Sequence, residues 1–171
     1  MISKFSYFLG LPASGKSTYL QENYPNILHL IEWLTSILDK PFDECNLDKI
    51  IQTIEDNLCI NETIVISADE IKPLLKGYTD EHPEVVHEES VQITRKIIFA
   101  IADSSKINCN VILDGGGINN HYNLSIIDYL RNKNVDKITC IFFDTPVEVC
   151  INRLQGRTRK VPIEDIYKKN L

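Results

Sequence analysis

A run of nine residues, 10–18, has the residue types and spacing of a phosphate-binding loop. Its sequence, GLPASGKST, matches the pattern GxxxxGK[ST] and follows an apolar run, 5–9, that predicts a buried strand. Backbone N–H groups of such a loop surround a phosphate, Lys16 can reach the β- and γ-phosphates, and the Ser17 hydroxyl can ligate Mg²⁺. A helix predicted to begin near Lys16 adds the positive end of its dipole. We therefore expect a nucleoside triphosphate and Mg²⁺ to bind here. The predicted nucleotide contacts in this loop are Gly10, Ala13, Ser14, Gly15, Lys16, Ser17 and Thr18.

Asp69 follows a second predicted strand, the β-branched run 63–67. An acid at this place faces the γ-phosphate and can accept the proton of an attacking hydroxyl, so Asp69 is the predicted general base. Two other interpretations stay open. Asp69 can cap the helix that follows it, or Asp69 and Glu70 can form the acidic pair of an ATP-hydrolysing motor, in which Glu70 polarises water. The motor is the less favoured of these interpretations because the chain is short.

Asp114 ends a third apolar run, 111–113, and three glycines follow it. An acid at the tip of a central strand can hold a Mg²⁺-bound water or a substrate hydroxyl, and Gly115 allows the backbone to approach a ligand. Asp114 and Ser17 are therefore the predicted metal ligands, and Asp114 and Gly115 are predicted to contact the substrate. The alternative is a tight turn with a capping aspartate.

The end of the chain is basic although the protein as a whole is acidic. The net charge is −6, but from Cys150 onward six Lys and Arg residues stand against two acidic ones. We expect a phosphate-clamping lid over 150–162; the alternative is a solvated basic helix end. Arg153 and Arg157 are four residues apart and share a face if a helix continues from Val147. Such guanidinium groups stabilise the charge on transferring phosphoryl oxygens, and Arg157 is predicted to be catalytic; Arg159 is less certain.

Short apolar strands alternate with helical patterns along the chain, which predicts an α/β fold with a parallel sheet of four to five strands covered by helices. Ligands of such sheets bind beyond the carboxyl ends of the strands, where the acids above would gather. The expected strands are 5–9, 63–67, 111–113 and 138–143, and the expected helices begin near Lys16 or cover 27–38, 47–58, 85–102 and 124–131.

The composition suits one domain over residues 1–171, large enough for a single core. The five cysteines form no CxxC pair and are predicted to be small buried apolar residues. No leader pattern or membrane-length apolar run is visible. We expect a soluble, cytoplasmic protein without a membrane partner.

These motifs together resemble a known family. The phosphate-binding loop, the Asp-x-x-Lys stretch at 69–72 and the tail 143–162 look like the kinase domain of phage polynucleotide 5′-kinase and related small P-loop kinases that include zeta toxins. The resemblance covers the first strand and loop and most of 63–171. It implies a P-loop kinase fold, with Lys16 and Ser17 at phosphate and metal, and Asp69 as general base. It also implies that Arg153 and Arg157 are lid arginines.

Two departures from that family pattern matter. Lys72 occupies a substrate-contacting position that carries arginine in the polynucleotide kinase, which weakens the case for a nucleic-acid acceptor. Residues 26–61, with two amphipathic helical patterns, have no counterpart in that kinase. This insertion can cover the acceptor site, form a dimer face or enlarge the core.

The sequence therefore predicts an ATP-dependent kinase that moves the γ-phosphate to an acceptor hydroxyl. The leading acceptors are a nucleic-acid 5′-hydroxyl or a nucleoside-type molecule, and a nucleotide sugar, as for zeta toxins, is the alternative. A non-catalytic module in which a nucleotide orders the basic lid is a third interpretation. GTP stays open beside ATP because no base-reading motif is present, and the oligomeric state is open as well.

Overall fold

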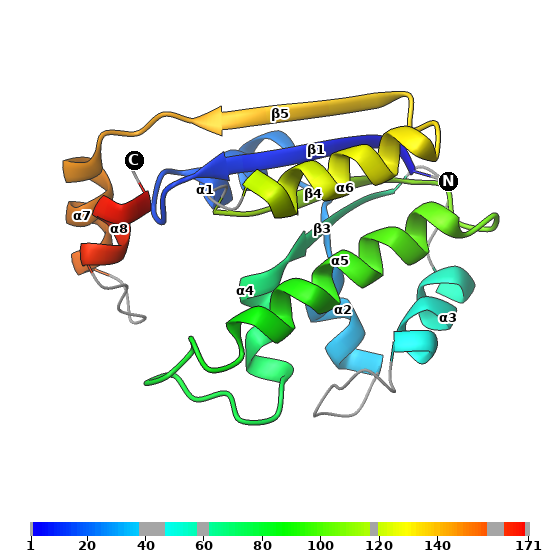
Figure 1. Ribbon diagram of the computed structural model, residues 1–171, viewed down its shortest axis with the longest axis horizontal. Coiled ribbons are helices and arrows are strands. Elements are labelled where there is room, and N and C mark those ends of the chain that lie inside the picture. The colour runs from blue at the N-terminus through cyan, green and yellow to red at the C-terminus, as the bar shows by residue number, and fades with distance from the viewer. Residues whose placement is uncertain (1, 38–46, 58–61, 117–119, 157–162, 170–171) are drawn as a thin grey trace.

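The computed structural model describes residues 2–37, 47–57, 62–116, 120–156 and 163–169. At its centre lies a five-stranded sheet in the order β2-β3-β4-β1-β5, and every neighbouring pair of strands is parallel (Figure 1). The α/β class with a parallel sheet is thus confirmed. The strands are β1 Ile2–Gly10, β2 Leu28–His29, β3 Thr63–Ser67, β4 Cys109–Asp114 and β5 Lys137–Phe143.

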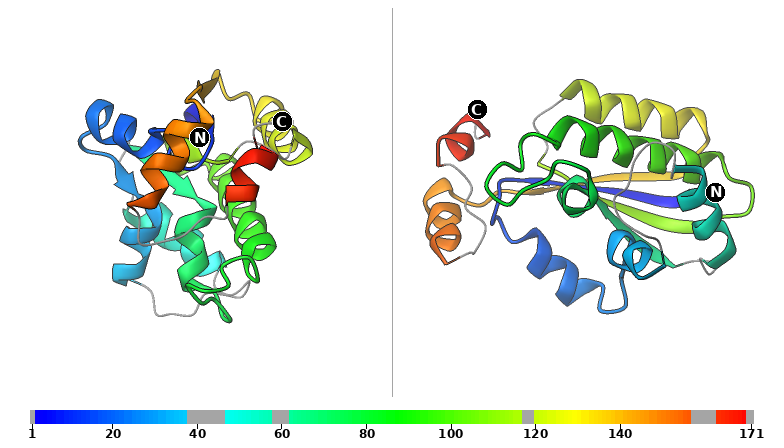
Figure 2. Two further views of the ribbon diagram at one scale, coloured as in Figure 1. Left: turned by 90° about the vertical axis from the view of Figure 1, so that its left-hand side faces the viewer. Right: turned by 90° about the horizontal axis from the view of Figure 1, so that it is seen from below.

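Helices cover both faces of this sheet. Figure 2 shows α5 (His87–Asp103) and α6 (Asn120–Asn132) on one face and α1 (Lys16–Asn23) on the other. The three central strands bury alternate residues in two separate clusters, as Tyr7 and Phe8 of β1 show. Strands buried on both faces have continuous apolar sequences, which is why β1, β3 and β4 lack a polar alternation.

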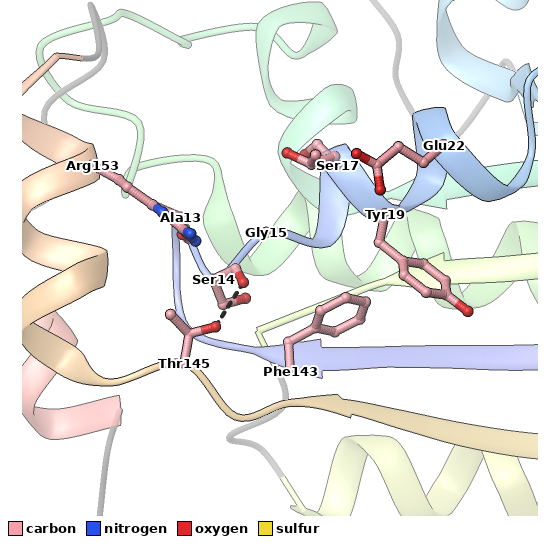
Figure 3. Close-up of a pocket in the computed structure, with 10 residues that line it drawn as sticks. Ala13, Ser14, Gly15, Ser17, Tyr19, Glu22, Phe143, Thr145 and Arg153 are labelled. Carbon is pink, nitrogen blue, oxygen red and sulfur yellow. Dashed lines mark hydrogen bonds between the residues drawn. The ribbon is translucent and has the colours of Figure 1, made fainter.

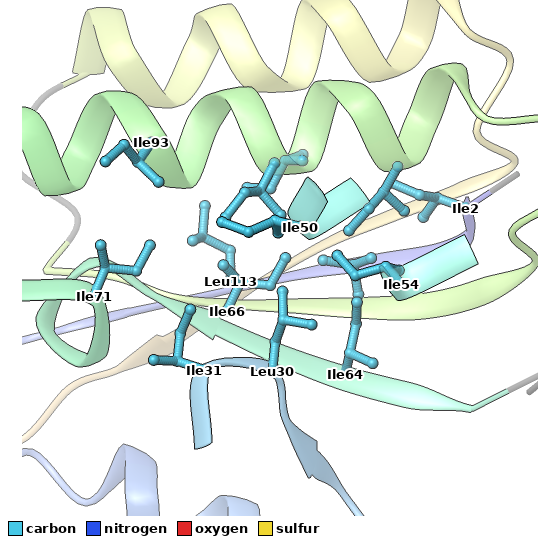
Figure 4. Packing of buried hydrophobic residues seen from close by; sticks show 14 of the residues in the cluster. Ile2, Leu30, Ile31, Ile50, Ile54, Ile64, Ile66, Ile71, Ile93 and Leu113 are labelled. Atoms are coloured by element: carbon cyan, nitrogen blue, oxygen red, sulfur yellow. The ribbon is translucent and has the colours of Figure 1, made fainter. Parts of the chain in front are cut away.

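The segment 26–61 forms β2, α2 (Leu30–Ile37) and α3 (Leu47–Asn57) within its described part. The helices bury their apolar stripes, including Leu30, Leu34 and Ile54, in the larger of the two clusters, together with side chains from the strands and α5 (Figure 4). Of the three roles open to this segment, enlargement of the core is the one that the packing shows.

The helix predicted over 27–38 begins later in the structure, at Leu30. Leu28 and His29 instead form a short strand that pairs in parallel with Ile64 and Val65 of β3. The helical spacing of the apolar residues is real from Leu30 onward, but pairing with β3 overrides it in the two preceding residues.

Four further helices, for which the sequence predicts no range, complete the described elements. They are α4 Ala68–Ile71, the 3₁₀ helix η2 Lys72–Leu74, α7 Val147–Gln155 and α8 Ile163–Lys169. A third apolar cluster joins Leu11 of the loop 10–18 to Val147 and Cys150 of α7 and Ile166 of α8. The C-terminal helices are therefore packed against the predicted phosphate-binding loop.

One prediction about the cysteines is wrong. Cys109 and Cys150 are buried, but Cys140, on the edge strand β5, is exposed. Cys45 and Cys59 lie outside the described residues.

Candidate functional site

The loop 10–18 leaves β1 in a conformation that requires glycine at its first position. Gly10 has φ +153°, and a Cβ atom there would lie 2.9 Å from Ser14 Oγ and 3.0 Å from the carbonyl oxygen of Phe143. Ala13 and Gly15 also have positive φ, at +62° and +104°. A left-handed alanine costs on the order of 1 kcal/mol, and such strain is concentrated at functional sites. The loop is therefore a tightly wound turn.

This turn leads directly into α1, which begins at Lys16 as predicted. No side chain caps the start of α1, and its first turn holds no acidic residue. The first N–H groups of a helix have no partner within the helix, and the helix dipole makes this end positive. The start of α1 is thus electrostatically suited to a bound anion.

A cavity of about 450 Å³ opens beside the loop and α1. Its size falls in the range of small-molecule sites. Figure 3 shows that loop residues, the end of β5 and Arg153 of α7 all reach its wall. The lining residues are Ala13, Ser14, Gly15, Ser17, Thr18, Tyr19, Glu22, Phe143, Thr145 and Arg153.

Side chains from the C-terminal part of the chain fasten the loop. Thr145 Oγ1 donates a hydrogen bond to the Ser14 carbonyl oxygen at 2.8 Å, and Arg153 Nη1 donates to the Ala13 carbonyl oxygen at 3.2 Å (Figure 3). Lys16 Nζ donates to the carbonyl oxygens of Gly10 and Leu11 at 2.9 and 3.1 Å. Two cations, Lys16 and Arg153, are therefore held against the loop's backbone.

Ser14 is buried, and its hydroxyl oxygen has no hydrogen-bond partner within the described residues although it borders the cavity. A buried hydroxyl without a partner costs about 1–3 kcal/mol. A ligand oxygen in the cavity would supply the missing partner.

Asp114 lies at the carboxyl edge of the sheet, where it ends β4 beside Ser67 of β3 and Phe8 of β1. Burial raises the pKa of Asp114, the nearby Lys16 ammonium lowers this pKa, and Asp69 raises it. Asp114 thus lies within electrostatic reach of both Lys16 and Asp69. The sheet thus gathers the predicted acids next to the predicted phosphate-binding lysine.

Asp69 belongs to the first turn of α4 and its side chain is 61% exposed. The N-cap of α4 is Ser67, so the alternative that Asp69 caps this helix is wrong. Asp69 Oδ1 accepts a hydrogen bond from Lys72 Nζ at 2.7 Å, and the Lys72 side chain is only 8% exposed. The structure places Lys72 as a buried partner of Asp69.

Glu70 and His29 form a pair at the same edge that sequence reasoning missed. His29 Nδ1 lies 2.9 Å from Glu70 Oε1, and the second oxygen, Oε2, is buried without a hydrogen-bond partner among the described residues. Burial raises the pKa of Glu70, while His29 lowers it. The sequence suggested Glu70 only as the water-polarising acid of the alternative ATP-hydrolysing motor. Nothing in the sequence singled out His29.

Some of the other predicted site residues are described by the structure and some are not. Ser17, Thr18 and Arg153 line the cavity. Gly115 follows Asp114 and lies against Tyr7, because a Cβ atom on Gly115 would be 2.8 Å from Tyr7 Cε2. Helix α7 ends at Gln155, and Arg157, Arg159 and the lid residues 157–162 lie outside the described residues.

The described residues contain no cluster of three or more His, Cys, Asp or Glu side chains suited to hold a metal ion. Ser17 and Asp114 do supply hard oxygen donors, and Mg²⁺ usually needs only one or two protein ligands beside phosphate oxygens and waters. The donor chemistry therefore fits a magnesium ion that arrives with a nucleotide.

Comparison with models of known protein families finds no match to this chain, and comparison with curated protein sequences finds none either. Within the described ranges, none of the helices has both the length and the apolar character needed to cross a membrane.

Proposed function

We propose that this protein is an ATP-dependent phosphotransferase that moves the γ-phosphate of a nucleoside triphosphate to an acceptor hydroxyl in the cytoplasm. The observation that carries the proposal is the strained turn 10–18, which joins β1 to the uncapped start of α1 and borders a 450 Å³ cavity. The resemblance to small P-loop kinases supports the same assignment.

On the donor side, the loop N–H groups and the start of α1 would hold the phosphates. Lys16 would neutralise charge on the β- and γ-phosphates after exchanging its bonds to the loop carbonyls for phosphate oxygens. Thr18, Tyr19 and Phe143 line the part of the cavity along α1, where aromatic rings offer a surface to the nucleoside. ATP and GTP both fit this description.

Ser17 and Asp114 would hold the accompanying Mg²⁺. The bound ion would supply positive charge that neutralises phosphate oxygens.

On the acceptor side, Asp69 is exposed to solvent and carries the role of base. As the acceptor oxygen bonds to the γ-phosphorus, its proton passes to the Asp69 carboxylate, and the bond from the γ-phosphorus to the β–γ bridging oxygen breaks. Lys72 holds Asp69 in place through the 2.7 Å bond. Arg153, and Arg157 on the proposed lid, would stabilise the charge of the transferring group.

The decisive experiment measures nucleotide binding and phosphate transfer separately. Wild-type protein and Lys16→Ala are incubated with γ-labelled ATP, Mg²⁺ and a panel of hydroxyl acceptors. Transfer by the wild type and its loss in the variant support a kinase. Nucleotide binding without transfer to any acceptor would instead identify a nucleotide-gated binding module, and absence of nucleotide binding would overturn both functions.

A further inference from the structure

The cavity beside α1 contains an acid that phosphate binding does not use. Among the described residues that line the cavity, Glu22 is the only acidic side chain and Arg153 the only basic one. Figure 3 shows that they approach the site from opposite sides, Arg153 from α7 and Glu22 from α1. A carboxylate repels a triphosphate. Glu22 is therefore suited to a part of the ligand that lies beyond the phosphates.

The geometry of α1 sets how far Glu22 lies from the phosphates. Glu22 follows Tyr19 by three residues and Thr18 by four, so the three side chains share the face of α1 that borders the cavity. At the rise of an α-helix, Glu22 lies about 6 Å further along the axis than Thr18. Figure 3 shows its side chain turned back along α1 in the direction of Ser17. The carboxylate is thus within one helical turn of the predicted phosphate contacts.

Aromatic rings form the wall of the cavity next to Glu22. Tyr19 and Phe143 meet edge to face with ring centroids 5.4 Å apart, and both pack against the buried ring of Phe8. These contacts fix the wall in place. Glu22 is exposed, and no side chain in the described part of the chain pairs with its carboxylate. Both of its oxygens are therefore open to a ligand in the cavity.

The chemistry of a nucleoside decides which donors meet this carboxylate. The ribose adjoins the phosphates and bears two neighbouring hydroxyls, whereas the amino groups of the base lie beyond the sugar. An ionised carboxylate only accepts hydrogen bonds, and its two oxygens match two adjacent donors. Acids bind ribose hydroxyls in this way in dinucleotide-binding folds. The position of Glu22, one turn from the phosphate contacts, favours the ribose over the base.

We propose that Glu22 binds the 2′- and 3′-hydroxyls of the ribose, and that the site thereby selects ribonucleoside triphosphates over their deoxy forms. The base lies against the rings of Tyr19 and Phe143, and such stacking tolerates any base because every base has a π-face. This inference rests on the nucleotide-binding part of the proposed phosphotransferase function and names its sugar specificity.

The test measures binding to the wild-type protein by titration calorimetry with Mg²⁺. The ligands are ATP, 2′-deoxy-ATP, 3′-deoxy-ATP, GTP and 2′-deoxy-GTP, with tripolyphosphate as a ligand that has no nucleoside. We expect each deoxy form to bind about tenfold more weakly than its parent, since hydrogen bonds to an exposed charged group lie at the lower end of their range. Equal binding of ATP and its deoxy forms would overturn the inference and leave the phosphotransferase function standing.

Glu22→Ala tests whether the carboxylate causes the preference. The variant should bind ATP more weakly, lose its discrimination against the deoxy forms, and bind tripolyphosphate as well as or better than the wild type. Removal of a negative charge by itself strengthens the binding of an anion, so charge alone predicts the opposite sign for ATP. Alanine is a strong helix former, so α1 is retained.

Two matched controls accompany this variant. Gln21→Ala changes an exposed neighbour on α1 that is outside the described cavity wall, and Glu148→Ala removes an exposed acid from the first turn of α7. Neither control should alter the ratio of the Kd for 2′-deoxy-ATP to the Kd for ATP. A ratio that persists in Glu22→Ala, or that falls equally in a control, would refute the role of Glu22.

The remaining outcomes separate this inference from its alternatives. Weaker tripolyphosphate binding in Glu22→Ala would assign the carboxylate to the phosphates or their Mg²⁺ and overturn the inference. A changed preference between ATP and GTP at an unchanged ribose preference would assign it to the base, with the same consequence. If the wild type binds none of the nucleotides, the proposed function itself fails. Ribose selection that depends on Glu22, without transfer to any acceptor, would support this inference while the phosphotransferase function fails.

Discussion

Substitutions at Asp69 and its partner Lys72 give the sharpest test of the proposed mechanism because Asp69 has two roles, as base and as ion-pair partner. As a base, Asp69 must accept a proton, which an amide does not do, so transfer should fall by roughly 10²–10⁴. As a structural residue, Asp69 holds the ammonium of Lys72 at 2.7 Å, and its loss would disturb α4. A single substitution changes both properties and cannot separate them.

The exposure of the two side chains sets the expected loss of stability. Removal of one partner from a buried ion pair costs about 3–5 kcal/mol, whereas exposed pairs contribute about 0.2–1 kcal/mol. Lys72 is 8% exposed but Asp69 is 61% exposed, so we expect a loss of about 1–2 kcal/mol, between these limits. Sequence reasoning alone predicts almost no change, since asparagine and aspartate cap helices equally well.

The double variant Asp69→Asn, Lys72→Met separates the two roles. Methionine matches the length of the lysine stem and removes the buried charge, so the free energy of unfolding should return to near the wild-type value. Lys72→Met alone serves as the matched control. Urea unfolding measures stability, and single-turnover transfer from γ-labelled ATP measures chemistry. Transfer that recovers together with stability in the double variant would refute the assignment of Asp69 as the base.

Three further substitutions test other parts of the site. Lys16→Ala should abolish transfer without unfolding the protein, as circular dichroism and a transfer assay would show; near-normal transfer would contradict the phosphate-loop assignment. Arg157→Ala should lower kcat by on the order of 10³ with a smaller effect on the Kd for ATP, and Arg157→Lys should rescue poorly because lysine lacks the planar fork; reduced affinity at unchanged kcat would make Arg157 a ground-state clamp. Burial raises the pKa of Glu70, so its contribution to stability is present below the ordinary glutamate pKa and is lost as the pH rises through the raised value. Glu70→Gln should therefore gain stability relative to wild type as the pH rises above the ordinary glutamate pKa, as urea unfolding at several pH values would show. A stability difference that shrinks with rising pH would contradict this sign.

The fold and the turn of the loop 10–18 could be predicted because their signals are local. The loop is contiguous, and the positive φ angles at Gly10 and Gly15 account for its two glycines. Strands buried on both faces, such as β3 and β4, appear as short apolar runs between helical patterns. Their carboxyl ends place Asp69 and Asp114 at one edge, as the parallel register of Ser67 with Asp114 confirms.

The relation of Asp69 to Lys72 was less accessible. Both residues were identified, one as a base and the other as a substrate contact, but their spacing of three residues is also that of an ordinary helical ion pair. Only the packing shows that the lysine is buried and the aspartate exposed. Arg157 shows a different limit: the four-residue spacing to Arg153 places both on one face only if the helix continues, and α7 ends at Gln155.

The contact of His29 with Glu70 could not have been found from the sequence. β2 has two residues, which is too short for any periodicity, and its neighbours have the spacing of a helix. Its position depends on pairing with β3, more than 30 residues away along the chain. A motif within one loop can be found from the sequence, whereas the contact between His29 of the insertion and Glu70 of α4 depends on long-range strand register.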